Sequence, residues 1–343
     1  MKAYLWPAIL GLAAAGPLVG TTGAENQREL AERLGALVEG YDVQTDDAGN
    51  VVLLALSNHP IHRKDNKAPP APGVRDDDLK ALLKMPRLRT VFLEKQPITN
   101  AGYAMLTRLP ELTDLRLHYL NDKLFRDRKG YTYPLADANA ALVVNELRRP
   151  LKVLEIKHCF AIRDVSIDRL KPQPELEKLE LDATFAGPKA VRFILGSPKV
   201  RNLQLHRTTM SDAELVCVLK GLPALEVLEL RPAGPRDRKA KPITARSLRG
   251  LEGHKKLRAV YMGINWPGTV YEGGLAQLAG IQTLEVVDLH DAQPKVTREH
   301  PAVKRLRQAR PDVTILAADG ILEGTGKLKA FPRDEHYRSG VMR

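Results

Sequence analysis

Three histidines recur at the same place in a repeated phrase of this 343-residue chain, which makes them the first candidates for chemistry. They are His118, His206 and His290. Imidazole nitrogens bind transition metals and carry protons near neutral pH. If each phrase forms one strand of a sheet, His118 and His206 lie roughly 14 Å apart, because neighbouring strands are about 4.8 Å apart. That separation is too large for one metal ion, so the pattern favours solvated surface histidines and predicts no metal or cofactor site.

The usual motifs of nucleophilic, zinc-dependent and phosphate-binding sites do not occur in the sequence. It contains neither Gly-x-Ser-x-Gly nor His-Glu-x-x-His. The stretch GILEGTGKLK at 320–329 resembles a phosphate-binding loop, but its glycine spacing is wrong and Leu328 stands where Ser or Thr would bind magnesium. Cys159 and Cys217 are too few for a disulfide framework, and we expect both to pack in the core. The sequence therefore predicts a protein that is not an enzyme. A hydrolase ranks third, behind the two non-enzymatic functions given at the end of this section.

Basic side chains gather in long segments between the phrases. The segments 58–75, 119–136 and 231–242 each hold more Lys and Arg than Asp and Glu, and a fourth segment, 263–274, is also long. Insertions on one face of a repeat protein often mark its binding surface, whereas ordinary charged loops are the alternative. The loop residues that we expect to contact a partner are Arg126, Arg128, Lys129, Arg231, Arg236, Arg238, Lys239 and Trp266.

The elements that must position these groups follow from a phrase that occurs five times. Residues 222–232 read LPALEVLELRP, and its close relatives are MPRLRTVFLEK, LPELTDLRLHY, QPELEKLELDA and SPKVRNLQLHR. Leu228 and Leu230 alternate with Val227, Glu229 and Arg231. This is the period-2 pattern of a strand with one buried face. Apolar residues then recur at helical spacing, as in SDAELVCVLKGLP. At five places a proline stands two residues before the next strand pattern and ends the preceding helix, so strand and helix alternate along the chain.

Small polar residues open the predicted helices. Thr99, Ser211 and Asp137 each precede an apolar helical pattern, where a side-chain oxygen can accept a hydrogen bond from a free backbone N–H group.

The shorter Leu-x-x-Leu-x-Leu pattern within the phrase begins at nine positions along the chain, and four of the eight steps between them are 24 or 25 residues long. This period and the Leu-x-x-Leu-x-Leu pattern resemble leucine-rich repeats, which run about 20 to 29 residues. The helix starts ITNAG and MSDAE are similar to the Ile-Thr-Asp-Ala-Gly-like starts of secreted bacterial forms. The resemblance covers roughly residues 25–316. It implies an α/β leucine-rich repeat solenoid, or horseshoe, of about nine repeats, with parallel strands on the concave face and helices on the convex face.

Two further stretches support the resemblance, and one position departs from it. DDAGNVVLLALS at 46–57 resembles an entry strand, and RLRQARPDVTIL at 305–316 resembles a closing helix and half strand. The asparagine that many such families place after each strand is mostly missing here, because that position holds residues such as Gln96, Cys159 and Thr208.

Alternate strand residues should face the concave side in this register. The middle column holds four carboxylates, so we expect an acidic strip that binds a partner, and we place Gln204 of the same column at the surface. Ordinary surface charges that pair with one another are the alternative. The concave residues that we expect to contact a partner are Arg116, Glu155, Glu180, Glu229, Tyr261 and Asp288.

The N-terminus has the pattern of a secretory signal peptide. Lys2 precedes an apolar run that ends in the small residues TTGA, and we expect cleavage after Ala24. A short membrane anchor is the alternative. The predicted division of the chain is a signal peptide at 1–24, an N-terminal capping helix and entry turn at 25–50, a leucine-rich repeat solenoid with loop insertions at 51–316, and a basic tail at 317–343.

Composition and charge complete the functional expectation. Hydrophobic residues make up 43% of the chain and charged residues 27%, so the chain can bury a sizeable core. The net charge of +12 would suit nucleic acid, but an export signal argues against that partner. We therefore expect a secreted or periplasmic protein that binds a protein or an anionic envelope polymer through its concave face and basic loop rim. A structural or scaffold protein of the envelope is the alternative.

Overall fold

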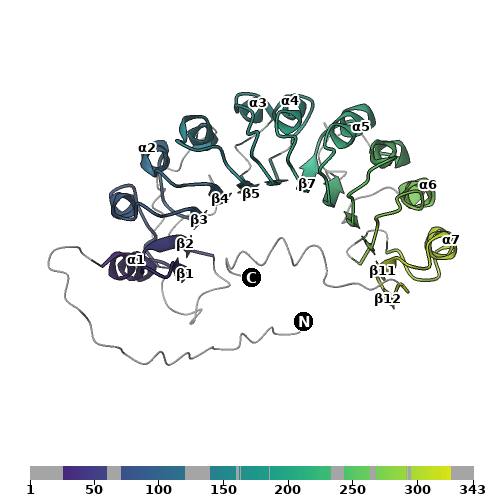
Figure 1. Ribbon diagram of the computed structural model, residues 1–343, viewed down its shortest axis with the longest axis horizontal. Coiled ribbons are helices and arrows are strands. Elements are labelled where there is room, and N and C mark those ends of the chain that lie inside the picture. The colour runs from purple at the N-terminus through teal and green to yellow at the C-terminus, as the bar shows by residue number, and fades with distance from the viewer. Residues whose placement is uncertain are drawn as a thin grey trace, which may run out of the picture.

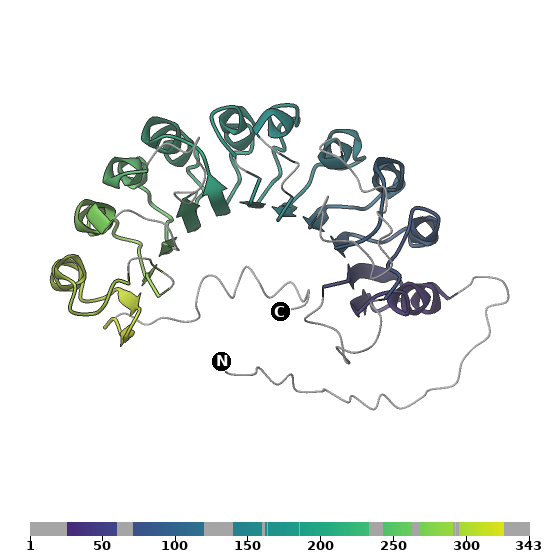
Figure 2. The same cartoon turned by 180° about the vertical axis from the view of Figure 1, so that it is seen from behind.

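The computed structural model describes residues 26–59, 71–119, 140–159, 162, 164–184, 186–232, 243–262, 268–290, 292 and 295–325. Its strands form one 12-stranded sheet in which the strand order follows the chain order from β1 to β12. The strands line the inner side of an arc and the helices line the outer side (Figure 1). The view from behind shows the same two layers (Figure 2). The predicted α/β class, with one mostly parallel sheet, is confirmed.

Ten successive strands are parallel, and their register is the predicted one. The middle column that was read from the sequence pairs residue by residue, for example Glu155 with Glu180 and Gln204 with Glu229. Side chains one repeat apart therefore stand side by side on the same face of the sheet. These strands are β2 (Val51–Ser57), β3 (Thr90–Glu94), β4 (Asp114–His118), β5 (Val153–Lys157), β6 (Lys178–Asp182), β7 (Asn202–Thr208), β8 (Val227–Pro232), β9 (Ala259–Met262), β10 (Val286–Asp288) and β11 (Thr314–Ala317).

The helices are short, and several have the tighter 3-10 geometry. Two predicted starts are confirmed: Thr99 accepts a hydrogen bond from the N–H of Ala101, and Ser211 forms a capping box with Glu214. Asp137 lies outside the described residues. The helical segments are α1 (Gln27–Gly35), η2 (Asp78–Lys84), α2 (Asn100–Ala104), η3 (Met105–Arg108), η4 (Ala140–Glu146), α3 (Asp164–Ile167), α4 (Ala190–Leu195), α5 (Asp212–Lys220), η5 (Ala245–Leu251), α6 (Gly268–Leu278) and α7 (Pro301–Ala309).

Each end of the sheet carries an antiparallel strand that the sequence analysis did not predict. Strand β1 (Gly40–Thr45) pairs with β2, and β12 (Gly320–Leu322) pairs with β11. Gly49 and Gly320 supply the positive φ angles, 78° and 145°, that these tight connections require. The two hairpins occupy the positions where a stack of parallel strands would otherwise end.

The main core lies between the sheet and the helices. The strand leucines that were predicted to face the core are fully buried. Leu203 lies between Leu179 and Leu228 of the neighbouring strands. Cys159 is buried, as predicted, but Cys217 is exposed, so its predicted place in the core was wrong. Cys217 precedes the buried Val218 of α5 on a 9-residue helix, and the helical turn carries its thiol to the solvent side.

Side-chain hydrogen bonds connect successive repeats. The Asp164 carboxylate accepts hydrogen bonds from the backbone N–H groups of Gly187, Lys189 and Ala190, at 2.9, 3.1 and 2.8 Å. Asp212 accepts one from the N–H of Thr244 in the same manner, at 2.7 Å. An aspartate of one repeat therefore satisfies free N–H groups at the helix start of the next repeat.

Two residues at the position after the strand, where many leucine-rich repeat families have asparagine, also connect repeats. Gln96 donates to the carbonyls of Leu56 and Glu94 at 3.2 and 2.8 Å, and the Cys159 thiol donates to Leu117 and Lys157 at 3.5 and 3.0 Å. Each side chain thus bonds the end of its own strand and the end of the preceding one, without an asparagine.

Candidate functional site

The predicted acidic strip is on the inner face of the sheet, but its carboxylates do not face solvent. The side chains of Glu155, Glu180 and Glu229 are 4%, 0% and 1% exposed, and Gln204 is also buried. The prediction of a solvated acidic surface was therefore wrong. Strands lie about 4.8 Å apart, and the sheet curves toward this face, so long neighbouring side chains cover the middle column.

Glu155 is the centre of a buried ion-pair cluster on β4, β5 and β6. Its Oε1 lies 2.6 Å from Lys178 Nζ and 3.6 Å from Arg116 Nε, and its Oε2 lies 3.3 Å from His118 Nε2. Burial alone would raise the pKa of Glu155. The charges of Lys178 and Arg116, together with the hydrogen bond from His118, instead hold this pKa well below its usual range. Glu155 is therefore ionised, and its charge is compensated within the protein.

Glu180 is compensated in the same way. Its two carboxylate oxygens lie 2.7 Å from Lys157 Nζ and 3.8 Å from Lys178 Nζ. Lys157 is the more accessible member, with 20% of its side chain exposed, so solvent meets the ammonium group above the carboxylate.

A second cluster lies toward the C-terminal ends of β6, β7 and β8. Asp182 Oδ2 lies 3.4 Å from His158 Nε2 and 3.6 Å from His206 Nδ1. The other nitrogen of His206 is 3.1 Å from Glu229 Oε1, which is itself 2.8 Å from Arg231 Nη2. The prediction that His206 is a solvated surface residue was wrong, because its side chain is only 9% exposed.

These contacts set the protonation of the second cluster. Burial works to raise the pKa of Asp182, but the hydrogen bond and charge of His206 lower it to about 2. Burial likewise works to lower the pKa of His206, but its hydrogen bonds with Asp182 and Glu229 raise it above the ordinary 6.5. His158 differs, because its burial lowers its pKa. Asp182 and His206 thus form a charged pair, and the neighbouring His158 imidazole favours its neutral form.

The backbone at the C-terminal edge of the sheet adopts the left-handed conformation in five successive repeats. The φ angles are 51° to 57°, although none of the five residues is glycine. Such a conformation costs about 1–3 kcal/mol and persists only where the surroundings enforce it. The first four donate their N–H groups to a backbone carbonyl at or near the end of the next strand, at 2.8 to 3.2 Å. The five residues are Lys95, Tyr119, His158, Ala183 and Arg207.

Three of these left-handed residues form a stack. The Tyr119 and His158 rings lie 4.5 Å apart with an interplanar angle of 18°, and Lys95 Nζ lies 4.8 Å from the centre of the Tyr119 ring. A lysine over a tyrosine ring is a cation–π contact. Lys95 follows β3 and His158 follows β5, whereas Tyr119 follows β4 between them, so the two contact its ring from opposite sides.

The stack, the exposed Arg207 and the second cluster without its buried Glu229 together form one continuous row along the C-terminal edge of the sheet. We call this set the edge row. Its exposed or half-buried charged members are mostly basic, and Asp182, its one accessible carboxylate among the described residues, is 13% exposed and paired with two histidines. The edge row consists of Lys95, Tyr119, His158, Asp182, His206, Arg207 and Arg231.

Both ends of the inner face are apolar. Phe92 packs with Leu53 and Ala55, and Tyr261 packs with Val227, Ala259 and Val286. Tyr261 is only 5% exposed, so its predicted contact with a partner lacks an accessible ring face.

The remaining predicted contacts fall in two groups. Asp288 is half-buried at the end of β10 and accepts a hydrogen bond from the N–H of His290, which lies beyond the strand that was predicted to contain it. The other predicted contacts, in the basic loops, lie outside the described residues. They are Arg126, Arg128, Lys129, Arg236, Arg238, Lys239 and Trp266.

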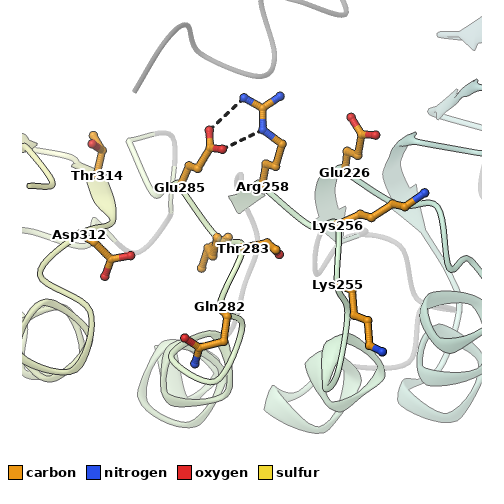
Figure 3. Close-up of a pocket in the computed structure, with 10 residues that line it drawn as sticks. Glu226, Lys255, Lys256, Arg258, Gln282, Thr283, Glu285, Asp312 and Thr314 are labelled. Atoms are coloured by element: carbon orange, nitrogen blue, oxygen red, sulfur yellow. Dashed lines mark hydrogen bonds and ion pairs between the residues drawn. The ribbon is translucent and has the colours of Figure 1, made fainter. Parts of the chain in front are cut away.

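The opposite, N-terminal edge of the sheet carries a shallow groove of about 530 Å³ (Figure 3). Its acidic side chains are held by arginines: Glu285 forms two hydrogen bonds with Arg258, at 2.9 and 3.0 Å. Lys255 and Lys256 are exposed in the turn before β9, and Figure 3 shows that they extend in different directions. They do not converge on one point, so the groove has no built anion site.

Within the described ranges, no group of three or more His, Cys, Asp or Glu side chains could hold a metal ion. In the same part of the chain, no helix is both long and apolar enough to cross a membrane.

No protein-family model matches the sequence, and no curated protein does either. Many solved structures resemble the fold, and two of them show how low the similarity is. A chain of the Rad7–Elc1 complex of yeast is 13% identical over 71% of this chain and 71% of its own length, with a TM-score of 0.40. The leucine-rich repeat-containing protein LegL7 from Legionella pneumophila is 14% identical over 75% and 79%, with a TM-score of 0.39. At this level of similarity, neither assigns a family or a function to the chain.

Proposed function

We propose that this chain is a leucine-rich repeat protein of about nine repeats that binds an anionic macromolecule outside the cytoplasm without catalysing a reaction. The observation that carries the proposal is the asymmetry of charge burial on the inner face. Three of the four carboxylates of the middle column, Glu155, Glu180 and Glu229, are buried, whereas the accessible charges at the C-terminal edge are mostly basic. A partner at this edge would therefore meet more lysine, arginine and imidazole groups than carboxylates.

The regular repeat supports a macromolecular partner over a small one. Equivalent side chains stand in register on successive parallel strands, so one chemical pattern extends across the sheet. The basic loops of the sequence follow the C-terminal ends of the strands, so their positive charge adjoins the edge row along the chain.

The extracytoplasmic location rests on the signal pattern at 1–24. We expect the mature protein to begin at Glu25, and intact mass of the protein from its native host tests this. A mass that includes Met1 would contradict the proposed location.

The binding proposal is tested by measuring the affinity for dextran sulfate and for polyglutamate across a salt series. We expect Lys95→Glu combined with Arg207→Glu to weaken binding about tenfold at low salt, which is about 1.4 kcal/mol. The affinity of the unmodified protein should fall as salt rises, because the Debye length falls from about 10 Å at 0.1 M to about 3 Å at 1 M.

The matched control is Lys255→Glu combined with Lys256→Glu. This variant reverses the same number of charges at the opposite edge of the sheet, where both lysines are exposed. Equal losses in the two double variants would mean that the probes respond to net charge alone. No binding to either probe would favour an envelope scaffold without a discrete ligand site.

A further inference from the structure

The edge row suggests a narrower partner class than the proposed function, on which this inference rests. The relevant feature is the stack of Lys95, Tyr119 and His158, because its geometry restricts what a partner can contact. Aromatic rings that bind carbohydrate do so with a free ring face, on which a sugar lies flat. Here Lys95 and His158 cover the Tyr119 ring from the β3 side and the β5 side. The stack therefore offers a partner the ring edge and the polar groups around it, and no free face.

The polar groups of the stack are hydrogen-bond donors. The Lys95 ammonium, the Tyr119 hydroxyl and an imidazole N–H can each donate to an oxygen acceptor. Carboxylates are strong acceptors for such donors, and charge-assisted hydrogen bonds are roughly twice as strong as neutral ones. The guanidinium of the exposed Arg207 extends the same chemistry along the edge, two repeats beyond His158.

The donors are also held in place before a partner arrives. Left-handed backbone fixes the chain direction at each of these residues, and the N–H groups of Lys95, Tyr119 and His158 are bonded to the next strand at 3.1, 2.8 and 2.9 Å. The stacked rings add a second constraint on the Tyr119 side chain. Binding then requires little ordering of these side chains, and this favours affinity from few contacts.

The length of the edge row matches a short peptide. From β3 to β8 the row crosses five inter-strand steps of about 4.8 Å, roughly 24 Å in all. An extended peptide advances about 3.3 Å per residue, so about seven or eight residues span the row. We infer that the edge row binds an extended acidic peptide segment of about this length, with carboxylates on Lys95, Tyr119 and Arg207.

The test compares four probes on the full chain by fluorescence anisotropy. They are an eight-residue polyglutamate, a three-residue polyglutamate, an eight-residue polyglutamine and dextran sulfate. We expect the eight-residue polyglutamate to bind at least tenfold more tightly than the three-residue one, and the polyglutamine not to bind.

Tyr119 is the discriminating residue. Tyr119→Phe keeps the stacked ring and removes only the hydroxyl, so we expect a loss of about three- to tenfold for the eight-residue polyglutamate. Tyr119→Ala should lose more than tenfold, and circular dichroism should show an unchanged fold. Both variants should bind dextran sulfate within about twofold of the unmodified protein.

The two proposals fail in different ways. If the unmodified protein binds dextran sulfate with strong salt dependence but not the eight-residue polyglutamate, the peptide inference is overturned and the proposed function stands. If Tyr119→Phe and Tyr119→Ala both bind that peptide as the unmodified protein does, the peptide inference is also overturned. If no anionic probe binds, both proposals are wrong.

Discussion

Replacing Leu203 by alanine tests the stacked architecture at a single side chain. Leu203 is fully buried on β7, and its partners in register, Leu179 of β6 and Leu228 of β8, are fully buried as well. The substitution removes three carbon groups, at about 0.8 kcal/mol each, and it leaves a cavity. Strand pairing holds Leu179 and Leu228 in place, so the cavity cannot collapse easily. We expect a loss of about 3–5 kcal/mol in the free energy of unfolding.

The assay is urea denaturation followed by circular dichroism, with Lys189→Ala as the control. Lys189 is exposed at the start of α4 and its side chain makes no capping hydrogen bond, so its replacement should change stability by less than about 0.5 kcal/mol. Gln204 follows Leu203 but is unsuitable as a surface control, because it is buried and donates to Asn202 Oδ1 at 3.3 Å. A loss below about 1 kcal/mol for Leu203→Ala would refute the inference that Leu203 packs between the leucines of two neighbouring repeats.

Four further predictions follow from the contacts between repeats and from the charges. Asp164→Ala should lower stability by about 1–3 kcal/mol in the same assay, because three backbone N–H groups of the next repeat lose their acceptor, whereas no loss would mean that water replaces it. The folded pKa of His206 is raised, so its contribution is complete below about pH 6.5 and is lost as pH rises through the folded value; His206→Gln should therefore destabilise more at about pH 6 than at about pH 9, and an equal cost at both would contradict the pairing. Stability should also fall as pH drops from about 4 toward 2, where Asp182 becomes protonated. Reversal of the loop residues Arg126, Arg128, Arg236, Arg238 and Lys239 to Glu should slow association with polyglutamate in stopped-flow measurements and leave the urea midpoint unchanged.

The sequence was sufficient to predict the sheet and its register, because one physical rule governs both. Alternation within each phrase identified the buried leucines, and the spacing between phrases aligned the columns that the strand pairs then confirmed, from Ala55 through Glu155 to Asp288. Proline and N-cap residues marked the turns for the same reason, since their effects are local. Cys217 shows the limit of this approach, because a single turn of helix separates a buried position from an exposed one.

The burial of the inner face could not be predicted from alternation. That pattern shows only which side of the sheet a residue occupies, and the residue's accessibility depends on the length of its neighbours and on the curvature of the sheet. Glu180 is on the predicted side but is covered because Lys157 and Lys178 reach it from two strands. The left-handed residues were also missed, since Lys95, Tyr119 and His158 carry no glycine signal for positive φ. Their equivalent position directly after successive strands was the one available sign.

Zero-length cross-linking of an acidic probe tests most directly whether partners bind at the C-terminal edge. A carbodiimide joins a carboxylate to a lysine ammonium only where the two are in contact, and mass spectrometry then identifies the lysine. With the eight-residue polyglutamate as probe, we expect adducts at Lys95, and fewer of them in the single variant Arg207→Glu. Adducts mainly at Lys255 and Lys256 of the opposite edge, or spread evenly over the exposed lysines of the helical side, would contradict the account.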